Sequence, residues 1–68
     1  MNELLEVAEV AKRLKCNKNK VYELIKVGAL QGLKLGRMKV STFELDAFMI
    51  RNAGKDLTDP YNIKELEH

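Results

Sequence analysis

Residues 7–26 read VAEVAKRLKCNKNKVYELIK, and this stretch predicts two short helices joined by a turn. In its first half, apolar residues recur at i, i+3, i+4 and i+7, which places them on one side of a helix of about eight or nine residues. These residues are Val7, Val10, Ala11 and Leu14. The next three residues, 15–17, interrupt the pattern, so we expect a turn there.

The second half of the stretch predicts another helix that begins near Lys18. Asn17 is suited to cap it, because an asparagine side-chain oxygen accepts a hydrogen bond from a free backbone N–H of the first turn. Gly28 is suited to end it in a left-handed conformation. The apolar side of this helix carries Val21, Leu24 and Ile25. Its opposite side is polar and basic, with Asn19, Glu23 and Lys26 at the centre and Lys20 and Tyr22 on the flanks.

After Gly28 the apolar residues alternate with polar ones around Gly36-Arg37, which predicts a β-hairpin with these two residues as its turn. The alternating positions are Leu33, Leu35, Met38 and Val40. The run Ser41-Thr42-Phe43-Glu44 has the pattern of a capping box and predicts a third helix. Its apolar positions are Leu45, Phe48 and Met49, and residues 52–54 are its expected end.

The apolar sides of these elements predict one hydrophobic core, whose burial allows a chain of this length to fold. The expected core residues are Val7, Val10, Leu14, Val21, Leu24, Ile25, Leu35, Val40, Leu45, Phe48 and Met49.

One domain accounts for residues 3–52, and residues 53–68 are predicted to be a flexible C-terminal tail. The tail has no apolar period, and Thr58-Asp59-Pro60 indicates a turn. Docking of Leu57, Tyr61 and Ile63 on the domain is the alternative. The last residues, Leu66-Glu67-His68, resemble the remnant of an affinity tag. We therefore expect the segment to be dispensable for folding.

Composition excludes several classes of protein. The 68 residues are 46% hydrophobic and 32% charged, and no apolar run approaches the roughly 20 residues that a membrane span needs. The acidic start does not resemble a signal peptide, so we expect a cytoplasmic protein without a membrane partner. Cys16 is the one cysteine and His68 the one histidine, which leaves neither a disulfide, a metal site, a cofactor nor a catalytic triad to propose. We expect no enzymatic activity.

Charge is distributed unevenly along the chain. Residues 12–39 contain nine lysines and arginines and one acidic residue, a net charge of +8, whereas the whole chain carries +2. A basic segment between acidic ends is typical of a protein that binds a polyanion. The alternative is a solvated, lysine-rich surface.

The residues in this order resemble the excisionase-type DNA-binding family, which is related to the N-terminal domains of MerR-type regulators. The similar segments span residues 4–51 and comprise 4–11, 21–26, 28–30, 34–37 and 44–49. The resemblance implies a mainly α fold with a small β-hairpin, a winged helix-turn-helix of three short helices plus a wing. In such folds the second helix enters the major groove and the wing lies on the DNA backbone.

The chain departs from the family pattern at four places. Glu6 stands where a threonine or serine usually caps the first helix, and Lys15-Cys16 replaces a common Gly-Val in the turn. Cys16 is then a small apolar residue filling the valine position, with a redox sensor as the alternative. Gln31 replaces a proline. The wing tip is one residue shorter than usual, which makes Arg37 its main phosphate contact.

The DNA-binding residues that we predict are Lys15, Lys18, Asn19, Lys20, Tyr22, Glu23, Lys26, Lys34, Arg37 and Lys39. The wing cations and Lys15 neutralise phosphates. Asn19 is suited to pair with adenine, and Lys18 and Lys26 to contact guanine or phosphate. Tyr22 contacts a phosphate, packs on the first helix, or both. Glu23 accepts a hydrogen bond from a cytosine or pairs with a neighbouring lysine.

The resemblance implies a sequence-specific, double-stranded DNA-binding accessory factor of a mobile element, one that bends DNA and directs excision by an integrase. Its partners are then DNA, an integrase or recombinase, and further copies of the chain that bind cooperatively on DNA. A small phage or plasmid transcription regulator with the same fold is the alternative. A third possibility is an interaction module whose basic side binds an acidic protein.

Overall fold

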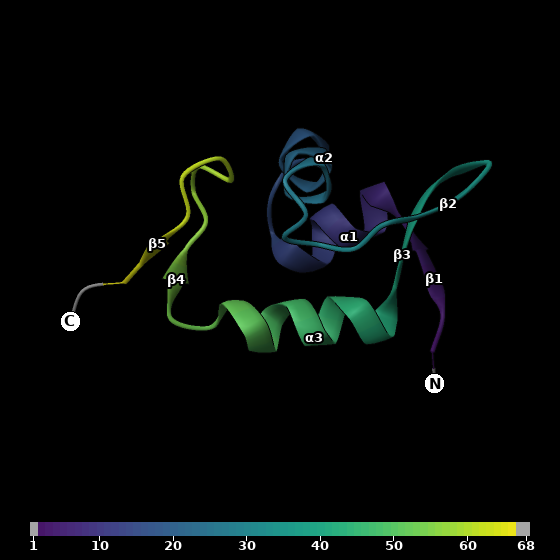
Figure 1. Ribbon diagram of the computed structural model, residues 1–68. Helices are drawn as coiled ribbons and strands as arrows, with labels where there is room; N and C mark the ends of the chain where they lie inside the picture. Colours follow the sequence, from purple (N-terminus) through teal and green to yellow (C-terminus); the bar gives the residue numbers. More distant parts are fainter. Residues whose placement is uncertain (1, 67–68) are drawn as a thin grey trace.

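A computed structural model describes residues 2–66 of the chain, and it contains three helices and two small antiparallel sheets (Figure 1). The helices are α1 (Val7–Leu14), α2 (Lys18–Lys26) and α3 (Thr42–Asn52). The strands are β1 (Leu4–Glu6), β2 (Leu33–Leu35), β3 (Arg37–Ser41), β4 (Lys55–Asp56) and β5 (Lys64–Glu65). This architecture confirms the predicted fold class, a small winged helix-turn-helix.

The turn between α1 and α2 forms where the sequence predicts it. Lys15 ends α1 in the left-handed region at φ 59°, and the Cys16 amide donates a hydrogen bond to the Ala11 carbonyl across 2.9 Å. The Asn17 side chain accepts a hydrogen bond from the Lys20 amide at 2.8 Å and caps α2 as expected. A glycine at position 15 would take the left-handed conformation without steric cost, which is the backbone reason for the family's usual residue there.

The first strand, β1, is absent from the sequence-based prediction. It pairs antiparallel with β3 and completes a sheet in the order β1-β3-β2, with Leu5 opposite Val40 and Glu6 opposite Lys39. Three residues are too few to show a period. The strand depends instead on pairing with residues more than thirty positions away.

The hairpin of β2 and β3, which we call the wing, has a turn one residue shorter than the predicted Gly36-Arg37 turn. Leu35 pairs with Arg37, so that Gly36 alone, at φ 73°, forms the tip. Because neighbouring side chains in a strand point to opposite sides, this shift of one residue moves Leu33 and Leu35 to the side opposite Met38 and Val40. Leu35 is therefore 65% exposed, and its predicted place in the core was wrong.

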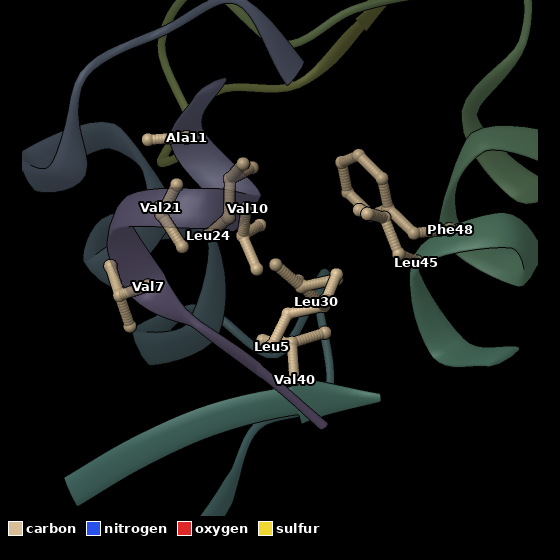
Figure 2. Packing of buried hydrophobic residues seen from close by; sticks show 10 residues of the cluster. All are labelled: Leu5, Val7, Val10, Ala11, Val21, Leu24, Leu30, Val40, Leu45 and Phe48. Atoms are coloured by element: carbon tan, nitrogen blue, oxygen red, sulfur yellow. The ribbon is translucent and has the colours of Figure 1, made fainter. Parts of the chain in front are cut away.

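The core lies between α1, α2, the sheet and α3 (Figure 2). Its buried residues are Leu5, Val7, Val10, Ala11, Val21, Leu24, Leu30, Val40, Leu45 and Phe48. Leu30 and Leu5 were not predicted; Leu30 sits in the loop after α2, is fully buried, and points toward Leu5 and Val40 in Figure 2. Leu14 and Ile25 pack at the margin of this core. Met49 is 48% exposed, so its predicted place in the core was wrong.

A network of polar contacts joins α3 to the loop that leads into the wing. Ser41 caps α3 by accepting a hydrogen bond from the Glu44 amide, but Glu44 does not complete the capping box. Its carboxylate accepts hydrogen bonds from the Gln31 amide at 3.0 Å and from the Arg51 guanidinium at 2.5 Å. A proline at position 31 has no N–H to donate. The departure from the family pattern at Gln31 thus supplies the contact that holds the start of the wing.

The C-terminal segment is structured up to residue 66, which differs from the flexible tail that we predicted. The strands β4 and β5 pair with Lys55 opposite Glu65 and Asp56 opposite Lys64. Leu57 packs against the core, as the docking alternative predicted, and Pro60 is buried. Tyr61 and Ile63 are exposed, so the alternative is confirmed for Leu57 alone. Strands of two residues give no periodic signal. Glu67 and His68, the end of the possible tag remnant, lie outside the described residues.

No helix within residues 2–66 has the length and apolar character needed to cross a membrane.

Candidate nucleic-acid interface

The outer side of α2 presents a continuous polar surface. Lys18, Tyr22 and Lys26 follow one another at intervals of four along the helix, and Asn19 lies beside them. All four side chains are exposed, Tyr22 by 50%. None of the four makes a side-chain hydrogen bond or ion pair inside the part of the chain that the structure describes. Their donors and acceptors therefore remain available to a ligand.

The other two predicted residues of α2 are engaged with the protein itself. The Lys20 ammonium donates a hydrogen bond to the Thr58 carbonyl at 2.5 Å and lies 3.8 Å from the Glu23 carboxylate. This places Lys20 and Glu23 on the flank of α2 nearest the C-terminal segment, apart from the surface that carries Lys18 and Tyr22. Pairing with a neighbouring lysine was one of the two roles that the sequence left open for Glu23.

The wing carries its cations on opposite sides. Lys34 shares a side with Met38, whereas Arg37 and Lys39 share the other side with Leu35 and Leu33. Arg37 stands near the tip with 84% of its side chain exposed. The Lys39 side chain is only 20% exposed and lies within the sheet. Lys15 is exposed at the turn between α1 and α2.

A polar depression of about 290 Å³ lies between the outer side of α2 and the wing. Lys18 and Tyr22 contribute from α2, Arg37 and Met38 from the wing, and Val7 and Ala8 from the first turn of α1. Tyr22 lines the depression together with Val7 and Ala8 of α1, so the two roles predicted for it are compatible. The depression brings together three of the predicted residues, two from α2 and one from the wing.

Glu6 is a site residue that the sequence marks only as a departure from the usual cap of the first helix. Its carboxylate accepts a hydrogen bond from the Lys39 ammonium at 2.9 Å and lies 3.9 Å from the Arg37 guanidinium. The hydrogen bond from Lys39, assisted by the charges of Lys39 and Arg37, lowers the pKa of Glu6 below its usual value. The signal for this role is the register that places Glu6 opposite Lys39, and it becomes visible only once β1 is paired with β3.

Cys16 packs against the core at the turn between α1 and α2, and the chain has no second cysteine. Burial raises the pKa of its thiol above the usual value. A raised pKa leaves less thiolate, the form that reacts with oxidants. The structure therefore favours the apolar packing role over the redox role.

Comparison with known proteins agrees with this geometry. No curated protein and no solved structure matches the chain at a significant level. The family model described as "Helix-turn-helix domain" matches residues 4–53, a span from β1 to the residue after α3. Because this match covers well over half of the chain and includes α1, the turn, α2 and the wing, the protein belongs to the helix-turn-helix domain family.

Proposed function

We propose that this protein is a sequence-specific, double-stranded DNA-binding protein that acts by binding and without catalysis. The observation that carries the proposal is the convergence of Lys18 and Tyr22 from α2 with Arg37 from the wing around one polar depression. A helix that presents polar side chains for the major groove, beside a basic wing for the backbone, is the docking arrangement of a winged helix-turn-helix.

Within this function the two elements have different roles. Asn19 and Lys18, in the first turn of α2, read base edges, because the start of a recognition helix reaches deepest into the groove. Arg37 and Lys34 on the wing, with Lys15 at the turn and Lys26 at the end of α2, neutralise phosphates. Lys20, Glu23 and Lys39 join the interface only after exchanging their contacts inside the protein.

We further propose an excisionase-like role, in which the protein bends DNA beside a recombination site and helps an integrase to favour excision in the cytoplasm. The family resemblance supports this role, as does membership of a family that includes excisionase-like small proteins. The integrase partner and cooperative binding of several copies on one DNA belong to this proposal.

Selection from a pool of random duplexes, followed by gel-shift titration, tests the DNA-binding proposal. We expect one enriched site that binds more tightly than random DNA. The same duplex, labelled at both ends for energy transfer, measures bending on addition of the protein. Enrichment without a change in end-to-end distance would retain DNA binding and exclude the bending role, whereas tighter binding to an acidic protein than to any duplex would exclude both.

A further inference from the structure

Among the described residues that line the depression between α2 and the wing, Glu6 is the only acidic one. The other polar members are Lys18, Tyr22 and Arg37. A carboxylate at a surface that meets phosphates is unfavourable for binding, because like charges at close range repel each other. Its presence there calls for a physical role.

Helix capping is not that role. Glu6 occupies the N-cap position of α1 with an extended backbone, yet its side chain makes no capping hydrogen bond. The carboxylate turns toward the wing instead, where it meets Lys39 and Arg37. The residue thus forgoes a contact that stabilises helix ends and joins β1 to the two cations of β3.

The two contacts of Glu6 differ in strength. Lys39 donates a hydrogen bond at 2.9 Å and its side chain is largely covered. Arg37 lies 3.9 Å away and its side chain is almost fully exposed. An exposed ion pair at that distance contributes little to stability, so Arg37 can leave Glu6 for a phosphate while Lys39 stays.

We propose that Glu6 is a specificity-determining residue, whose carboxylate takes the place of a DNA phosphate beside the wing and thereby weakens binding to DNA of any sequence. This inference rests on the proposed DNA-binding function. Phosphate contacts supply affinity without sequence information. A residue that withholds Lys39 from phosphates lowers this general affinity and leaves the base contacts of α2 to decide which sites are bound.

Glu6→Gln, which keeps the shape of the side chain and removes its charge, tests the proposal against the matched variant Glu9→Gln. Glu9 forms an ion pair with Arg13 at 3.2 Å on α1 and does not line the depression. Both variants change the net charge equally. Binding to a labelled duplex of random sequence is measured by fluorescence anisotropy at several salt concentrations.

We expect Glu6→Gln to bind the random duplex about fivefold more tightly than Glu9→Gln at low salt, the factor for one charge contact in water between the freed Lys39 and a phosphate. Its plot of log affinity against log salt should be steeper by about 0.9, because Lys39 gains a phosphate. In a Lys39→Gln background most of this advantage should disappear. In the unchanged protein, addition of duplex should shift the carboxyl carbon resonance of Glu6 and leave that of Glu9 in place.

Equal affinities of the two variants would reduce the effect to net charge and overturn the inference, as would weaker binding by Glu6→Gln or an unmoved Glu6 resonance. These results leave DNA binding itself intact. Failure of the unchanged protein and of every variant to bind any duplex at low salt is a different result, because it refutes the proposed function.

Discussion

The proposed function assigns separable roles to single residues at the wing tip and at the start of α2. In the proposed function Arg37, exposed at the end of a hairpin, contacts the DNA backbone, and Asn19, in the first turn of α2, reads base edges. Sequence patterning predicted both residues, because helix periodicity and turn chemistry determine which side chains face outward. It did not predict the pairing of Lys39 with Glu6, which depends on a contact between distant segments.

Arg37→Ala should weaken binding to a selected site and to random DNA by a similar factor. Asn19→Ala should instead reduce the preference for the selected site by about 1 to 3 kcal/mol, the contribution of one good base contact. Anisotropy titrations of both variants with both duplexes measure these effects. A changed sequence preference in Arg37→Ala with an unchanged one in Asn19→Ala would reverse the two assignments.

Leu30 and Leu35 form a matched pair for testing the core, since both are leucines outside the helices. Leu30 is completely buried, so Leu30→Ala should lower the free energy of unfolding by about 2 to 5 kcal/mol. Leu35 faces solvent on the wing, and Leu35→Ala should change the same quantity by less than about 0.5 kcal/mol. Urea denaturation followed by circular dichroism measures both, with Leu30→Val as a milder substitute if Leu30→Ala is too unstable. Similar costs for the two alanine variants would contradict the register of the wing.

At the scale of elements, the sequence predicted the pieces whose structure is local. The first two helices, the Asn17 cap and the end of α3 follow from periodicity and capping residues within a few positions. The missed features, β1, the tip of the wing and the β4–β5 hairpin, all depend on partners far away or on a shift of one residue. Local patterns cannot specify such pairings, because a strand of two or three residues gains its stability only from its partner.

The contact of Glu44 with Arg51 and the Gln31 amide should make the stability of the fold depend on pH. The hydrogen bond from Arg51 lowers the pKa of Glu44 in the folded chain, assisted by the Gln31 amide. The stabilisation is therefore complete above the usual glutamate pKa of about 4.3 and is lost as the pH falls through the lowered value. Melting temperatures measured from about pH 7 down to about pH 3, a range that includes the usual glutamate pKa, should fall as Glu44 becomes protonated. In Glu44→Gln the loss should be smaller, whereas Asp46→Asn on the exposed side of α3 should behave like the unchanged protein.

Removal of the C-terminal hairpin tests its docking on the domain. Leu57 packs against the core, and Lys20 donates to the Thr58 carbonyl, so truncation after Gly54 should lower the melting temperature by several degrees. In a domain of this size about 1 kcal/mol corresponds to roughly 4 to 8 °C. Leu57→Ala should reproduce part of the loss, and exposed Tyr61→Ala should not. An unchanged melting temperature after truncation would contradict docking of the hairpin and support the dispensable tail that the sequence predicted.

At the scale of the whole molecule, the charge pattern and the fold agree. The +8 of residues 12–39 is distributed over the end of α1, the turn, α2 and the wing, and the hairpin of β4 and β5 lies at the opposite end of the molecule from the wing (Figure 1). Charge along a chain was informative here because most of the basic segment lies in the turn, α2 and the wing, which together form the candidate interface. The polyanion interpretation therefore leads to a definite surface for DNA.

The central claim, that this surface binds duplex DNA through phosphate contacts, is tested most directly by the salt dependence of affinity. A labelled duplex is titrated with the protein between low and physiological salt. About six phosphate contacts predict a slope of roughly −5 in a plot of log affinity against log salt concentration. An affinity that hardly changes with salt, or no binding at low salt, would contradict the claim.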